Sequence, residues 1–233
     1  MKCTAILCAL ATVCCFSTGN AANNAGTAAL TRLKSEVQST TNDLSRYGRN
    51  LIYNTRSKLS DLKIVALTNI NSITNPALAA IQSEVDQAKA AGKNADHCFE
   101  PSRQRIRLAS LNSWKVLDKC ASDALATVDP AKNNIDALLQ LGNRLTSELD
   151  AIAINCISSN AMATQNCIVA KIPEASSTVN TYRDTANSMK QSGDKASSDA
   201  QISGRSCYQG GVQTVRDETN GARADAHQCV ANA

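Results

Sequence analysis

The spacing of the cysteines constrains this chain more than any other feature of its sequence. Six of its ten cysteines form three pairs nested about one point, namely Cys98 with Cys229, Cys120 with Cys207 and Cys156 with Cys167. The position numbers sum to 327 for the two outer pairs and to 323 for the inner pair. Antiparallel helices advance by about 1.5 Å per residue in opposite directions, so facing residues have a nearly constant sum. This symmetry predicts a helical hairpin that turns between Cys156 and Cys167.

The N-terminus has the pattern of a secretory signal peptide. Lys2 precedes an uncharged apolar run that ends in small residues, and we expect cleavage after Gly19, with Ala21 or Ala22 as alternatives. The run is shorter than the roughly 20 residues of a membrane span, and no later segment is long and uncharged enough to be one. We therefore expect a secreted, extracellular protein with residues 1–19 removed and no transmembrane segment.

Cleavage would remove the other four cysteines, leaving six in an oxidising compartment where disulfides persist. Cys98 and Cys120 are twenty-two residues apart, which is roughly 33 Å along one helix, whereas bridged cysteines need Cα atoms within about 7 Å. The nested pairing satisfies this limit. Parallel pairing, or a last helix broken at Gly210 and Gly211, stays open as an alternative. Zinc is a poor use of these cysteines, because the closest two are eleven residues apart and zinc sites favour Cys-x2-Cys pairs.

Helical periodicity runs through the mature chain, and strand patterns are absent. We predict an all-α fold, an elongated disulfide-stapled antiparallel helical bundle with coiled-coil-like seams. Helices are expected at residues 28–71, 76–92, 101–126, 130–156 and 168–193, followed by a polar segment and a last helix. In the domain organisation that follows, residues 20–96 form an N-terminal helical hairpin with a turn at 73–75, and residues 97–233 form the stapled hairpin or bundle, in one continuous domain.

Each of the four prolines is expected near the start of a helix, where its missing N–H does no harm; they are Pro76, Pro101, Pro130 and Pro173. The apolar stripe of residues 101–126 is expected to turn Leu111, Trp114 and Leu117 inward. Trp114, Tyr182 and Met189 could line a ligand cavity, but their seam spacing is more typical of core residues.

The chain contains only two histidines, His97 and His227, each near an outer cysteine and an aspartate. Nested pairing would bring them together, where they could bind zinc or copper, but solvated histidines beside a disulfide are the favoured interpretation. No nucleophile elbow, His-Glu-x-x-His, phosphate-binding glycine loop or EF-hand loop occurs. We therefore expect no enzyme activity, cofactor or metal, and the absence of an Asn-x-Ser/Thr sequon argues against N-glycosylation.

The charge is nearly balanced, at +4 with the histidines neutral. The densest basic cluster, residues 103–107, is typical of a solvated helix face. With one Trp, four Tyr and two Phe, the chain lacks aromatic platforms for stacking bases, so nucleic acid is a poor candidate partner.

The mature chain is helical and rich in Ala, Asn, Ser and Thr, its six cysteines are confined to its C-terminal two thirds, and it carries the hinge Asn155-Cys…Asn166-Cys-Ile168. In these features it resembles insect secreted proteins built on the domain named after tsetse EP protein. The Glu-Pro repeats of the founding member are missing here, and Glu100-Pro101 is the only such dipeptide. The six-cysteine insect odorant carriers match less well, because this chain lacks their close Cys-x3-Cys pair.

The resemblance implies an extracellular insect protein without an established activity. We expect a secreted, non-enzymatic helical interaction protein that binds a protein or surface partner. The alternative is an extracellular carrier of a lipid or small apolar ligand.

Overall fold

The computed structural model describes the secondary structure of residues 4–233 and the side chains of residues 24–233. The expected signal peptide, residues 1–19, and its four cysteines lie outside the residues whose side chains are described. The elements in chain order are α1 (Thr4–Ala90), η1 (Asp96–Cys98), α2 (Phe99–Ala126), α3 (Asp129–Asn155) and α4 (Ala161–Asn232). Helices make up 94% of the chain and the described part contains no strand, so the predicted all-α class is confirmed.

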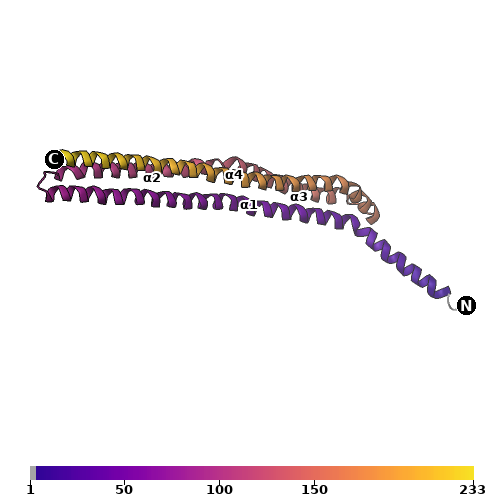
Figure 1. Cartoon of the computed structure of the whole chain (residues 1–233). Coiled ribbons are helices and arrows are strands. Elements are labelled where there is room, and N and C mark those ends of the chain that lie inside the picture. The colour runs from indigo at the N-terminus through magenta and orange to yellow at the C-terminus, as the bar shows by residue number, and fades with distance from the viewer. Residues whose placement is uncertain (1–3) are drawn as a thin grey trace. The chain divides into compact units, whose positions relative to one another are not determined.

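Two compact units share the longest helices. Unit 1 consists of residues 1–49 and 131–192, and unit 2 of residues 50–130 and 193–233. α1 and α4 contribute to both units, α3 lies in unit 1 apart from its first two residues, and α2 lies in unit 2 (Figure 1). Each unit combines two segments that are distant in the sequence, so its limits do not coincide with the expected boundary at residues 96–97.

In unit 1, α1 and α4 run parallel. Near the start of both segments, Gln165 donates from Nε2 to Thr27 Oγ1 over 2.7 Å. Further along both, the Tyr47 hydroxyl donates to the carbonyl of Lys190 over 2.6 Å. Position numbers thus increase together in the two helices, with an offset of 138 to 143 residues at these contacts.

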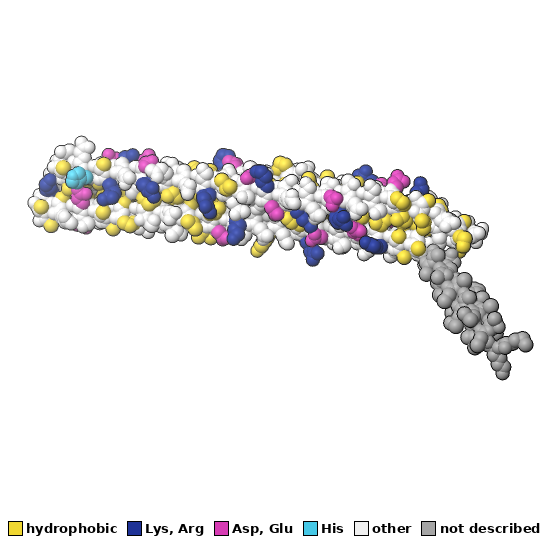
Figure 2. All heavy atoms as spheres, turned by 45° about the vertical axis from the view of Figure 1, so that its right-hand side comes forward, with side chains coloured by type: hydrophobic (Ala, Val, Ile, Leu, Met, Phe, Trp, Pro, Cys, Tyr) yellow, Lys and Arg dark blue, Asp and Glu magenta, His cyan; other side chains and the backbone are white. Residues whose placement is uncertain are grey.

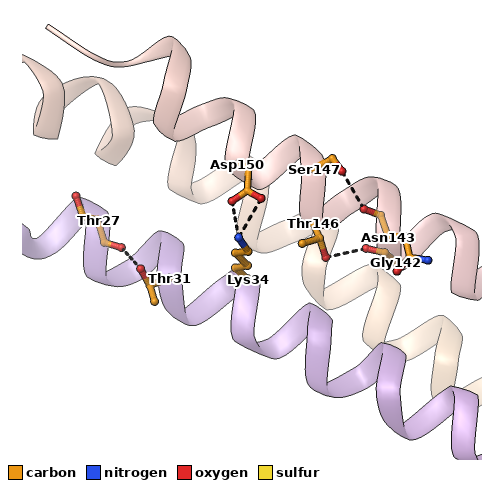
Figure 3. A network of polar contacts seen from close by, with 8 residues as sticks. All are labelled: Thr27, Thr31, Lys34, Gly142, Asn143, Thr146, Ser147 and Asp150. Carbon is orange, nitrogen blue, oxygen red and sulfur yellow. Dashed lines mark hydrogen bonds and ion pairs between the residues drawn. The ribbon is translucent and has the colours of Figure 1, made fainter.

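α3 completes unit 1 and runs antiparallel to α1. Lys34 Nζ lies 2.7 and 2.9 Å from the two carboxylate oxygens of Asp150, so the start of the described α1 faces the end of α3 (Figure 3). A Cβ added at Gly142, further back along α3, would meet Thr41, further forward along α1. The fully buried side chains between the helices are aliphatic and include Val37, Leu44, Ile135, Leu149 and Val179.

Unit 2 has the same arrangement, with α2 as its antiparallel helix. The hydroxyls of Thr55 and Ser197 are 2.6 Å apart, and further along both helices Glu84 Oε1 lies 2.5 Å from His227 Nδ1, so α1 and α4 again advance together. Buried apolar residues of the described part of unit 2 form three clusters. The cluster nearest unit 2's middle combines Ala66, Ile70, Leu117, Cys120, Tyr208, Val212 and Val215.

The coiled-coil-like seam predicted for the bundle is confirmed in α3. The buried positions of α3 are Ile135, Leu138, Gly142, Leu145 and Leu149, at alternating steps of three and four. Such a repeat is typical of helices that pack at small crossing angles.

The predicted inner face of α2 is wrong in part. Leu111 and Trp114 are 41% and 49% exposed, whereas Ser102 and Ser113 are buried. Both serines donate to carbonyls of α4, Ser102 to Ala222 over 3.0 Å and Ser113 to Gly211 over 3.2 Å. Small residues allow the two backbones to approach closely, and these hydrogen bonds satisfy the buried hydroxyls, so the serine face packs inward.

The expected turn at residues 73–75 is also wrong, because α1 continues through Pro76 to Ala90. The ring removes the hydrogen bond to the carbonyl of Ser72, and both residues are exposed to solvent, which can hydrate that carbonyl. Buried Ile70, Ala77 and Ile81 flank the site and hold the helix in the core. Pro173 likewise lies inside α4, which also continues unbroken past Gly193 and Gly210 to Asn232.

The structure places the cysteines in the nested pairing. Cα atoms are 5.6 Å apart in Cys98–Cys229, 5.7 Å in Cys120–Cys207 and 5.5 Å in Cys156–Cys167. The first two join α4 to η1 and α2 within unit 2, and the third closes the α3–α4 loop of unit 1. Three such pairs are compatible with an extracellular protein.

One helix among the described residues, Asn24–Ala90, contains a window with a mean hydropathy of 1.3, long and apolar enough to cross a membrane. Only 28% of that window is buried. The buried Ile70 and Ile81 in the charge-free stretch 64–83 belong to the core clusters of unit 2. The expected absence of a membrane span stays a prediction.

Candidate functional site

A groove between α1 and α4 in unit 2 is the site best equipped to bind a charged group; we call it the arginine groove. Its volume is about 600 Å³, within the range of roughly 300 to 1,000 Å³ typical of ligand sites. The residues that line it are Leu62, Val65, Ala66 and Asn69 of α1 and Arg205, Tyr208, Gln209, Val212, Gln213 and Arg216 of α4.

The spacing of these residues follows from helical periodicity. On α4 they recur at steps of three and one, so they form a single stripe that faces the groove. Arg205 and Arg216 stand at the two ends of the stripe, eleven residues or roughly 16 Å apart. Apolar Val65, which is 57% exposed, lines the opposite wall.

Neither arginine is neutralised by an acidic side chain in the described part of the chain. Arg216 donates to Gln213 Oε1 over 3.1 Å, and Arg205 has no hydrogen bond or ion pair among the described residues. Arg105 shows the contrast, because its guanidinium lies 2.7 Å from Glu218 and 2.6 Å from Asp225. The arginine groove thus keeps two positive charges available to an anionic ligand.

Tyr208 forms the buried floor of the arginine groove. Its side chain is 2% exposed, and its hydroxyl donates to the carbonyl of Leu59 over 3.2 Å. Burial raises the pKa of this phenol, and the nearby negative charge of Asp118 raises it further. Tyr208 is therefore a neutral, fixed part of the groove wall rather than a reactive group at neutral pH.

A second groove of about 810 Å³, which we call the apolar groove, lies between α2 and α4 of the same unit. Leu108 and Val116, both nearly half exposed, form walls along α2. Gly210 and Gly211 line it on α4, and a Cβ at Gly210 would meet no atom within 4 Å. The only charged residues lining it are Arg105 and Glu218, which pair with each other, so this groove carries no net charge.

The two histidines have different surroundings. His97 Nε2 lies 3.5 Å from Cys229 Sγ and 3.8 Å from Cys98 Sγ. His227 is exposed, and its Nδ1 lies 2.5 Å from Glu84 Oε1 on α1. The two histidines considered as metal ligands thus contact different groups, His97 the outer disulfide and His227 the carboxylate of Glu84.

The three residues considered for a cavity fall in different places. Tyr182 is buried in unit 1, where its hydroxyl lies 2.8 Å from Thr41 Oγ1, and its pKa is raised by burial. Met189 is partly buried in the same unit, whereas Trp114 is half exposed in unit 2.

The sequence prediction missed both grooves. The stripe from Arg205 to Arg216 is visible as a helical repeat, but nothing local indicates that α1 lies beside it. Comparison with protein-family models, with curated proteins and with solved structures finds no match to this chain.

Proposed function

We propose that this protein is a secreted, non-enzymatic interaction protein that binds an acidic helical segment of a partner protein in the arginine groove. The observation that carries this proposal is the pair of arginines without acidic partners, Arg205 and Arg216, at the two ends of one apolar-walled groove. Arginine suits such a role, because its planar guanidinium donates two parallel hydrogen bonds to a carboxylate.

The shape of the site favours a helical occupant. A groove between two parallel helices is the place that a further helix takes when a three-helix arrangement becomes a four-helix bundle. Two carboxylates eleven residues apart on one helix are separated by about 16 Å, which matches the spacing of the arginines. Val65 and Val212 would contact the apolar face of that helix between the two charges.

The surroundings of His227 and Glu84 support a role without catalysis. The pair of His227 and Glu84 lies in a shallow groove of about 320 Å³ whose other lining residues are Ala80, Ile81, Asn220, Arg223 and Ala224. That lining offers no serine, threonine or cysteine that an imidazole could activate. On the face drawn in Figure 2, basic and acidic side chains are interspersed along the surface, as expected of a solvated protein.

A designed peptide tests the proposal directly. The probe is a fluorescently labelled amphipathic helix of about 18 residues with two glutamates eleven positions apart on its apolar face, compared with a peptide in which glutamines replace them. Fluorescence anisotropy should show tighter binding of the glutamate peptide, and the affinity should fall with added salt. Charge-assisted hydrogen bonds contribute about 1.5 to 3 kcal/mol each, so Arg205→Gln with Arg216→Gln should weaken binding at least tenfold.

Arg223→Gln is the matched control, because it removes an exposed arginine of the same helix outside the arginine groove. It should leave the affinity unchanged within about twofold. Equal affinities for the glutamate and glutamine peptides would contradict the proposal, and so would equal losses in the double variant and in Arg223→Gln.

The apolar groove favours a second candidate function, a carrier of a lipid or small apolar ligand. Its volume of about 810 Å³ and its neutral walls at Leu108 and Val116 suit an uncharged molecule. Native mass spectrometry of protein purified from its source tests this function, since a carrier should retain an apolar ligand. Val116→Glu should then abolish its retention, whereas ligand-free protein from the natural source would count against the carrier.

The resemblance to insect secreted proteins with the tsetse EP domain is consistent with either function. Secretion and removal of residues 1–19 also belong to this proposal. N-terminal sequencing of secreted protein tests them, because a chain that begins at Met1 would contradict the cleavage.

A further inference from the structure

His97, Cys98 and Cys229 form the densest cluster of metal-ligating side chains in the part of the chain that the structure describes. Their ligand atoms all lie within 4.8 Å of one another. His97 and Cys98 belong to η1, and Cys229 lies near the end of α4, so the cluster unites two segments more than 130 residues apart, all within unit 2. His97 is exposed, which leaves the cluster open to solvent.

The imidazole is already placed as a tetrahedral metal site requires. With Zn–S distances of about 2.3 Å and Zn–N distances of about 2.0 to 2.1 Å, tetrahedral geometry sets the nitrogen about 3.6 Å from each sulfur. His97 Nε2 lies 3.5 Å from Cys229 Sγ and 3.8 Å from Cys98 Sγ. The two sulfurs are bonded to each other here, and the distance between them would have to increase to about 3.8 Å for both to bind one zinc ion.

We propose that reduction of the Cys98–Cys229 disulfide creates a redox-dependent zinc site made of His97 Nε2 and the Sγ atoms of Cys98 and Cys229. A dithiol reductant supplies two electrons, is oxidised to its own disulfide, and leaves two cysteine thiols. A zinc ion then replaces the two thiol protons, which pass to solvent, and His97 binds through its unprotonated Nε2. Water completes the tetrahedron, as in zinc sites with three protein ligands.

Contacts other than the disulfide hold the two segments together. Cys98 packs in a buried cluster with Val85, Ala88, Ala95 and Val230, the residue that follows Cys229. Lys93 Nζ also donates to the carbonyl of Val230 over 3.0 Å. The ligands should therefore remain close after reduction, with Cα atoms near their present separation of 5.6 Å.

Its contact with a histidine distinguishes this bridge from the other two. The chain has two histidines, and His227 is engaged with Glu84, so neither Cys120–Cys207 nor Cys156–Cys167 has an imidazole in a described contact. Reduction of all three bridges should then yield one site with a histidine ligand. His227→Ala provides a matched control that removes the second histidine and leaves the cluster intact.

The test measures zinc affinity of the full chain in its oxidised form and after reduction with a phosphine, by competition with a chromogenic chelator. Reduced protein should bind one zinc ion that oxidised protein does not bind. His97→Ala keeps every thiol and should weaken zinc binding at least about tenfold. Removal of a residue that only hydrogen-bonds a metal ligand already costs about tenfold or more in metal affinity, so loss of a ligand should cost no less. Cys98→Ser with Cys229→Ser should abolish it, and His227→Ala should leave it unchanged.

Nuclear magnetic resonance keeps the test decisive if a variant folds poorly. Because only two histidines are present, their ring nitrogens can be followed individually in the reduced protein, and zinc should shift Nε2 of His97 but not the ring of His227. Equal zinc affinity in His97→Ala and the unaltered protein, or an unshifted His97 ring in the zinc-bound protein, would overturn the proposal.

Discussion

The hydroxyls of Thr41 and Tyr182 meet at the surface of α3 in the space left by the missing side chain of Gly142. Replacement of Gly142 by alanine should therefore show how tightly unit 1 is packed. The Thr41 and Tyr182 hydroxyls are 2.8 Å apart above this position. A Cβ at Gly142 would clash with both hydroxyl oxygens and would lie 2.8 Å from Tyr182 Cζ, closer than real Cβ atoms come to other heavy atoms. Tyr182 is 2% exposed, so its ring has little room to move.

Three contributions determine the change in the free energy of unfolding for Gly142→Ala. Overpacking of a close core typically costs about 1 to 3 kcal/mol. Loss of the hydroxyl pair costs about 1 kcal/mol more. Alanine is favoured over glycine inside a helix by about 1 kcal/mol, which offsets part of the loss. We therefore expect a net destabilisation of about 1 to 3 kcal/mol.

Gly210→Ala is the matched control, because the same substitution inside a helix meets no atom within 4 Å. Only the helix preference then remains, and the protein should become more stable by about 0.5 to 1 kcal/mol. Urea unfolding followed by far-ultraviolet circular dichroism measures both variants. A Gly142→Ala protein as stabilised as Gly210→Ala would refute the close contact.

Further predictions concern buried polar groups, bridges and pH. Thr219 Oγ1 is buried without a hydrogen-bond partner, so Thr219→Val should raise the free energy of unfolding by about 1 kcal/mol, and a loss would contradict this. The Cys120–Cys207 bridge closes a separation of 87 residues, so replacing both cysteines by alanine should lower the free energy of unfolding by up to about 4.5 kcal/mol. A urea titration that shows no loss of stability would exclude the bridge. Burial raises the pKa of Tyr182 and Tyr208 in the folded protein above the value of about 10 that they have in the unfolded chain. Their contribution to stability is therefore full below pH about 10 and is lost as the pH rises through the raised pKa. Tyr182→Phe should reduce the loss of stability at alkaline pH.

The sequence predicts the α3–α4 hairpin well because local and long-range signals agree there. The heptad-like repeat from Ile135 to Leu149 fixes which face is buried, and the pair Cys156–Cys167 at the turn fixes the register of the partner helix. A helical repeat and a distance limit on bridged cysteines both follow from backbone geometry, so they can be applied to the sequence without knowledge of side-chain packing.

Prediction fails where packing overrides a local preference. Pro76 favours a helix start in isolation, yet buried residues on both sides keep α1 intact through it. In α2, hydrophobicity favours Trp114 as a core residue, whereas Ser113 is buried because its hydroxyl finds the carbonyl of Gly211. A serine can thus occupy a core that admits only small residues, provided that its polar group is satisfied.

The candidate sites escape sequence analysis for a related reason. The hydrogen bonds between described residues of α1 and α4 join positions 138 to 149 residues apart, and parallel helices leave no constant sum of position numbers to detect in the sequence. The arginine groove exists only because α1 supplies Val65 beside Arg205 and Arg216. The cluster at His97 likewise exists only because nested pairing returns Cys229 to η1. The arginine groove therefore depends on the register of α4 against α1, and the cluster at His97 depends on the return of α4 to η1, so a change that shifts α4 lengthwise within unit 2 should disturb peptide binding and zinc binding together.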